Sequence, residues 1–124
     1  MASCRFCGAK MGWASGKAYG SAAEDIGVAL SVLIGITHVV ESSDPAWSGL
    51  PDFIDEGAQL ARALHVAGHS RGIVPDRAAW HEWERVSLLV MNQFKQSYPD
   101  GMALAATPET GREARELILA GWAA

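Results

Sequence analysis

The chain's two cysteines, Cys4 and Cys7, lie in the segment CRFCG. A C-x-x-C turn followed by glycine supplies two thiolates for a zinc knuckle, because Gly8 lets the backbone fold over the metal. A tetrahedral site needs two further ligands. His65 and His69 are the best pair, since residues at i and i+4 lie on the same face of a helix. The sequence therefore predicts a Cys2His2 zinc site made of Cys4, Cys7, His65 and His69.

The same cysteines have other interpretations. The CRFCG segment of a second chain would complete the site in a homodimer, and His38 and His81 are weaker candidate ligands on other helices. Without metal, the cysteines are two uncoordinated thiols near a chain end. A thioredoxin-like redox pair is disfavoured, because that motif follows a strand and three residues before Cys4 are too few to form one.

Hydrolytic or acid-base chemistry is not favoured by the remaining motifs. Residues 68–72 spell G-x-S-x-G, but a nucleophile elbow is a turn from strand into helix, whereas this segment closes an expected helix. The acids at 55 and 56 and the polar group at 81–84 do not converge, because consecutive helical residues point roughly 100 degrees apart. We interpret both groups as solvated polar faces.

No phosphate loop, dinucleotide fingerprint or convergent nucleophile and base is recognisable, so the chain is more readily interpreted as a binding protein than as an enzyme. The alternative is a zinc-dependent enzyme. In that hypothesis Cys4, Cys7 and one or both of His65 and His69 hold zinc and leave one coordination position open for water.

The negative charge of the chain, −4 over 124 residues, arises from one stretch. Residues 21–61 contain seven acids and no Lys or Arg, whereas residues 62–124 contain seven of each sign. Direct binding to nucleic acid is disfavoured, because neutralising phosphates requires clustered Lys and Arg. A negative surface potential suits a basic protein partner instead.

Two of the five tryptophans, Trp13 and Trp47, lie in segments without helical periodicity. A tryptophan in such a segment either folds back as a lid on the core or stays partly exposed as an interface anchor. Together with the acids at the start of an expected helix, they form our candidate partner-binding set: Asp52, Asp55, Glu56, Trp13 and Trp47.

Capping residues and apolar periodicity predict an all-α fold, and no segment alternates with the period of a strand. We expect one domain, residues 1–124, with an irregular segment at 1–20 that carries the C-x-x-C motif and a compact bundle of about four helices at 21–124. A capping box at Ser21 and Glu24 starts the first helix. The expected helices run from Ser21 to about Glu41, from Pro51 into the GHSRG segment at 68–72, from Pro75 or Asp76 toward Tyr98, and from Thr107 to about Trp122.

The first expected helix has no charged residue from Ile26 to Val40, which is typical of a central buried helix. A membrane span is the rival interpretation. It is disfavoured because the flanks are acidic and His38 interrupts the run. Gly27, Ser31 and Gly35 recur every fourth position, which allows a neighbouring helix to approach closely.

Taken together, these features predict a small regulatory module that binds a basic protein partner through an acidic surface. Two cysteines three positions apart cannot cross-link distant parts of a fold, so we expect the reducing cytoplasm as its location. One such partner is a nucleic-acid-binding protein whose basic groove is blocked, as small phage-encoded inhibitors do. That comparison is based on size and charge alone.

Overall fold

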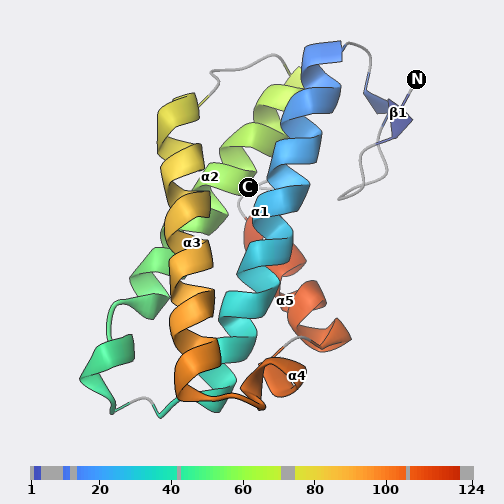
Figure 1. Ribbon diagram of the computed structural model, residues 1–124. Helices are drawn as coiled ribbons and strands as arrows, with labels where there is room; N and C mark the ends of the chain where they lie inside the picture. Colours follow the sequence, from blue (N-terminus) through green and yellow to red (C-terminus); the bar gives the residue numbers. More distant parts are fainter. Residues whose placement is uncertain are drawn as a thin grey trace.

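The structure is a computed structural model of the chain, and it confirms the prediction of an all-α helical bundle (Figure 1). For residues 2–3, 10–11, 14–18 and 68–70 it describes the backbone alone. The residues that it describes are 2–3, 10–11, 14–41, 43–70, 75–105 and 107–120.

Five α-helices and one 3-10 turn make up the described part of the bundle, together with one short antiparallel strand pair near the N-terminus. The strands are β1 (Ala2–Ser3) and β2 (Lys10–Met11). The helical elements are α1 (Ala14–Val39), η1 (Pro45–Trp47), α2 (Leu50–Ser70), α3 (Arg77–Ser97), α4 (Gly101–Ala105) and α5 (Pro108–Leu119).

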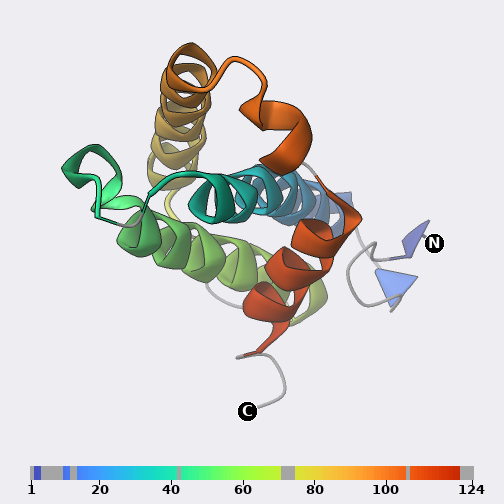
Figure 2. The ribbon, with the colours of Figure 1, turned by 90° about the horizontal axis from the view of Figure 1, so that it is seen from below.

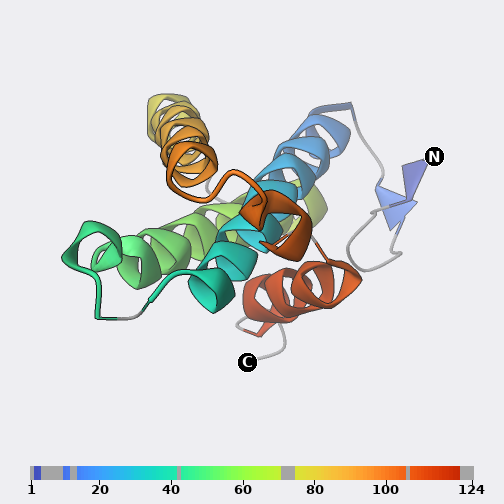
Figure 3. The same ribbon diagram turned by 60° about the horizontal axis from the view of Figure 1, so that its bottom comes forward.

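Helix α1 is the centre of the bundle, as its uncharged sequence predicted. It contacts all four other α-helices. α2 returns antiparallel beside it, and α3 then runs in the direction of α1 again (Figure 1). Seen from below, α3 and α5 lie on opposite sides of the α1–α2 pair (Figure 2). In this arrangement the start of α2 and the helix α3 lie at the same edge of the bundle. Figure 3 shows this edge from a third direction.

Helix α1 begins earlier than expected. The capping box at Ser21 predicted its start, but the helix already includes Ala14. The helical turn before Ser21 is stabilised by tertiary packing, because Tyr19 is partly buried and packs against the core. Packing of this kind overrides the weak helix propensity of glycine at positions 16 and 20. The backbone of residues 14–20 is therefore helical, and not irregular as expected.

The core is built on the apolar side chains of α1. Ile26, Leu30 and Leu33 have no exposed surface, and Phe94 of α3 is equally buried. At Gly35 the backbone of α4 lies directly on α1, since a Cβ placed there would come within 1.9 Å of the Ala105 carbonyl oxygen. Close packing inside the chain therefore explains the glycine at this position of the small-residue repeat.

Helix α5 is held at its C-terminal end by an arginine of α2. Arg62 donates from Nε to the carbonyl oxygen of Ile118 and from a terminal guanidinium nitrogen to that of Leu117, each at 2.8 Å. The last carbonyls of a helix lack partners inside the helix, and a cation near them is also favoured by the helix dipole. This contact fixes α5 to the bundle independently of the apolar core.

Among the described residues, the segment Tyr19–Val39 of α1 has the length and apolar composition of a membrane span. The core helix of a soluble protein meets the same criteria. Core packing accounts for the apolar residues on the buried side of α1, while Val28 on its outer side is 61% exposed. The absence of a membrane interaction stays a prediction.

Candidate functional site

The η1 turn positions Trp47. A carboxylate oxygen of Asp44 accepts a hydrogen bond of 2.9 Å from the backbone N–H of Ala46, and Pro45 occupies the first position of the turn. These are the preferences of a helix start, and they fix the direction of the next side chain. Trp47 is only 8% exposed and meets Phe94 edge to face, with ring centroids 6.2 Å apart. Of the two alternatives for this tryptophan, the lid on the core is confirmed.

One aromatic contact joins the first half of α2 to α3. The indole of Trp83 stacks on Phe53 with centroids 4.9 Å apart and an angle of 11° between the rings. Its Nε1 donates a 2.9 Å hydrogen bond to the Phe53 carbonyl oxygen. Gly57 gives the indole room, since a Cβ there would lie 2.1 Å from the ring. Trp83 therefore sets the spacing of α2 and α3 at this level.

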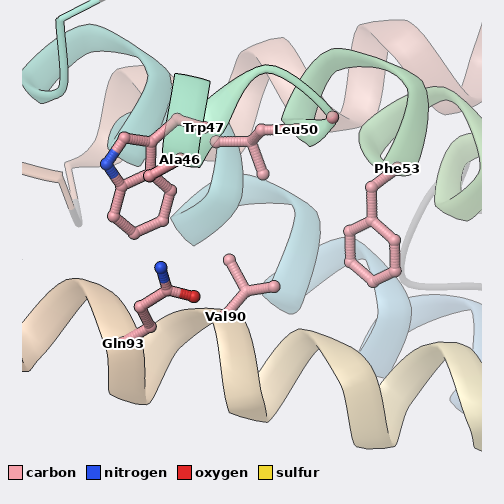
Figure 4. Close-up of a pocket in the computed structure, with 7 residues that line it drawn as sticks. Ala46, Trp47, Leu50, Phe53, Val90 and Gln93 are labelled. Atoms are coloured by element: carbon pink, nitrogen blue, oxygen red, sulfur yellow. The ribbon is translucent and has the colours of Figure 1, made fainter. Parts of the chain in front are cut away.

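Beyond that contact the two helices enclose a pocket of 210 Å³, which we call the anchor pocket (Figure 4). Its walls are apolar, and its rim residues are exposed to solvent, so the pocket is accessible from outside. Figure 4 shows Val90 and Gln93 rising from α3 toward Leu50 and Trp47, with Phe53 at one end. The walls are Trp47, Leu50, Phe53 and Val90, and the exposed rim is Ala46, Gly49 and Gln93.

The predicted acidic residues Asp52, Asp55 and Glu56 lie in the first half of α2, the helix that supplies Leu50 and Phe53 to this pocket, and all three are exposed. We call them the acidic face. None of them forms an ion pair with another residue that the structure describes. Asp52 and Glu56 are one helical turn apart and flank Phe53 in the sequence, so the acidic face borders the wall of the anchor pocket.

The polar residues at 81–84 lie in different surroundings. Glu82 is paired with Arg85 through two hydrogen bonds of 3.0 and 2.5 Å, and the hydrogen bond from Arg85 lowers the pKa of its carboxyl. Glu84 behaves differently. Burial raises the pKa of its carboxyl, His81 opposes this shift, and the charge of Asp25 on α1 adds to it. Glu82 and Glu84 therefore lie in different environments and do not form a shared acid-base site.

The G-x-S-x-G segment has the helical context that its interpretation as a helix end required. Residues 68–70 form the last turn of α2, and the residues before them are helical, not extended. A nucleophile elbow needs a strand there. Residues 71 and 72 lie outside the described residues.

The strand pair near the N-terminus was not predicted, and β1 lies within the three residues before Cys4 that we expected to be too few for a strand. Ala2 pairs with Met11 and Ser3 with Lys10, so the pairing brings together the two ends of the segment that contains both cysteines. Cys4 and Cys7 themselves lie outside the described residues, as does Trp13. The only local signal was the turn-forming C-x-x-C-G motif, which is too short to fix strand register.

Of the four expected zinc ligands, the structure describes the side chain of His65 only, and that side chain is fully buried. The backbone of His69 belongs to the last turn of α2, and its side chain is outside the described part. In that part of the chain, no three His, Cys, Asp or Glu residues form a metal-binding group. The Cys2His2 site stays a prediction.

The two weaker candidate ligands, His38 and His81, belong to no such group in the part of the chain that the structure describes. His38 of α1 is exposed, and its Nε2 lies 3.4 Å from a carboxylate oxygen of Glu113 on α5. His81 is exposed on α3, and its ring is tilted against that of Trp80 at a centroid distance of 5.6 Å. Both imidazoles have contacts that explain their positions without a metal.

Asp52, Asp55, Glu56 and Trp47 were predicted as partner-binding residues, but the anchor pocket that Trp47 lines was not predicted. The aromatic residues at 47, 53 and 83 were visible, yet their separation depends on how α2 and α3 pack. No family model matches this chain, and no curated protein or solved structure matches it either.

Proposed function

We propose that the chain is a cytoplasmic protein-binding module whose acidic face receives a basic protein partner. The observation that carries this proposal is the set of three exposed carboxylates on α2 that make no ion pair with a described residue, beside an open apolar pocket. Interfaces commonly combine such an apolar centre with a charged rim.

The charges of neighbouring residues also favour a basic partner. Asp44 caps η1, and Glu41 is exposed just after the end of α1, so carboxylates also precede the pocket residues along the chain. No Lys or Arg occurs in residues 21–61 to neutralise them. A local excess of one sign raises the association rate of an oppositely charged partner and disfavours partners of like charge. A nucleic-acid-binding protein presents such a basic surface, and occupying it would inhibit that protein.

The proposal is tested by reversing the acidic face. The triple variant Asp52→Lys, Asp55→Lys and Glu56→Lys should keep its stability, since exposed charges contribute little to it. Its association rate with Lys- and Arg-rich peptides selected from a random library should fall about tenfold or more at low salt, because steering acts on the on-rate. Stopped-flow measurements at several salt concentrations give these rates.

The matched control makes the same change of net charge elsewhere. Asp100, Glu109 and Glu116 are exposed, and in the described residues none of them forms an ion pair. Changing these three to Lys should slow association much less. If both triple variants lose the same fraction of the rate, the peptides respond to net charge and the acidic face is not the binding surface.

A zinc site is our second proposal, either structural or as the centre of a zinc-dependent enzyme. The pairing of β1 with β2, which joins the ends of the cysteine segment, favours it. A zinc knuckle uses a short hairpin of this kind to hold two thiolates. The full burial of His65 is compatible with a ligand only if the N-terminal segment reaches the interior of the bundle.

Metal analysis tests this second proposal. We expect about one zinc ion per chain after expression with added zinc, and a lower melting temperature on chelation, because metal affinity contributes to folding free energy. Replacing Cys4 and Cys7 by Ser should reproduce both effects, while His81→Ala should change neither. A stoichiometry near zero would exclude the site. Full zinc in a His65→Ala, His69→Ala variant would exclude these two ligands and point to a second chain.

A further inference from the structure

We infer that the basic partner binds through a short segment in which one apolar side chain enters the anchor pocket and basic residues flank it on both sides. This inference rests on the proposed function and specifies its ligand class. It follows from the size of the pocket, from the chemistry of its walls and from the position of the carboxylates around it.

The size of the pocket fits one side chain. Its volume is 210 Å³. An apolar cavity of about 150 Å³ is large enough to bind benzene. The ring of a phenylalanine or the branched end of a leucine therefore fits, whereas two such groups do not. Side chains that fill pockets near the centre of an interface are among the few residues that supply most of its binding energy.

The walls of the pocket select an apolar group. Trp47, Leu50 and Phe53 enclose it from η1 and α2, and Val90 encloses it from α3 (Figure 4). The side-chain amide of Gln93 stands at the rim and makes no hydrogen bond to a described residue. An amide offers one acceptor and two donors, which match the C=O and N–H groups of an extended peptide backbone. The pocket therefore offers burial inside and hydrogen bonds at the edge.

The carboxylates determine what flanks the anchor. On one side of the rim, Asp44 caps the η1 turn through the backbone N–H of Ala46, itself a rim residue. On the other side, Asp52 and Glu56 belong to the turns of α2 that carry Phe53. Lys or Arg on both sides of the apolar residue would therefore each meet a carboxylate. The expected recognition segment is a basic residue, an apolar residue and a basic residue in close succession.

Three synthetic peptides separate the anchor from the charge: Ac-KRFRK-NH2, Ac-KRARK-NH2 and Ac-EDFDE-NH2. The dissociation constants are measured by titrating the ¹⁵N-labelled protein and following amide shifts. The phenylalanine peptide should bind about tenfold or more tightly than the alanine peptide, because it buries a ring. The acidic peptide should bind more weakly than either, since its charges repel the acidic face.

Filling the pocket tests its location. A Cβ at Gly49 meets no atom within 4 Å, so Gly49→Leu can place its side chain over the pocket without a backbone clash. This variant should bind the phenylalanine and alanine peptides equally well. Ala46→Leu fills the pocket from the other rim and should act in the same way. Gly111→Leu on α5 also has open space at its Cβ and should keep the tenfold preference.

Each outcome bears on a different proposal. Equal binding of the two basic peptides by the unmodified protein, or a preserved preference in both Gly49→Leu and Ala46→Leu, would overturn the anchor pocket and leave the acidic face standing. Equal binding of the acidic and basic phenylalanine peptides would overturn the acidic face. No binding of any peptide at millimolar concentration would overturn both. Circular dichroism of each variant verifies that the helices are retained.

Discussion

Replacing Trp83 by alanine is expected to lower the free energy of unfolding by about 3–5 kcal/mol, the usual cost of removing a buried aromatic side chain. Trp83 is 2% exposed, stacks on Phe53 and donates a hydrogen bond to its carbonyl oxygen. No other described contact between α2 and α3 combines these three features. Urea unfolding followed by circular dichroism measures the change, because the far-ultraviolet signal of the helices remains when the indole is lost.

The conservative variant Trp83→Phe serves as the control. It keeps an aromatic ring against Phe53 and Gly57 but loses the hydrogen bond, so we expect a smaller cost of about 1–3 kcal/mol. If Trp83→Ala costs no more than Trp83→Phe, the ring itself contributes little and the hydrogen bond is what joins the two helices. A loss below 1 kcal/mol in both variants would contradict the spacing role that we assign to Trp83.

The second large effect is expected at Gly35. Alanine is the better helix former by about 1 kcal/mol, yet Gly35→Ala should lower stability by about 1–3 kcal/mol. The reason is that the new Cβ would meet the Ala105 carbonyl oxygen at 1.9 Å, and a backbone atom cannot rotate away as a flexible side chain does. Either α4 moves or α1 bends, and both changes expose core surface. Thermal and urea unfolding give the difference.

A second glycine provides the matched control for this substitution. Gly111 lies inside α5 with open space around its Cβ, so Gly111→Ala should raise stability by roughly 0.5–1 kcal/mol. Opposite signs for the two Gly→Ala changes would show that helix packing, not helix propensity, determines the result at Gly35. A stabilising Gly35→Ala would mean that α4 is not packed on α1 in solution.

Most of the helical framework was predictable because its signals are local. Thr107 caps α5 as expected, and Asp76, near the expected start of the third helix, caps α3. Each accepts a hydrogen bond from a backbone N–H of the first turn. Helix α4 was not predicted. It has only five residues and begins at the glycine of a Pro-Asp-Gly turn, so its sequence carries too little periodicity to identify a helix. The start of α1 was wrong because a capping box is a short pattern that tertiary packing at Tyr19 can override.

The candidate site was only partly predictable. The exposed acids of α2 follow from composition and helical periodicity, and the acidic face was found in that way. The anchor pocket depends on the distance between α2 and α3, which Trp83 and Gly57 set through a contact across 26 residues of sequence. No periodicity in either helix encodes that distance. Packing of large side chains against a glycine is visible only in three dimensions.

The arginine contact at the end of α5 has a consequence for which substitutions the chain can accept. Arg62 holds carbonyl oxygens of the main chain, and every amino acid at 117 or 118 supplies the same oxygens. This contact therefore requires arginine at position 62, but it requires no particular side chain at position 117 or 118. In a diverging set of sequences, position 62 should stay arginine while position 117 drifts among apolar residues, so the contact would leave no trace of covariation between the two helices that it joins.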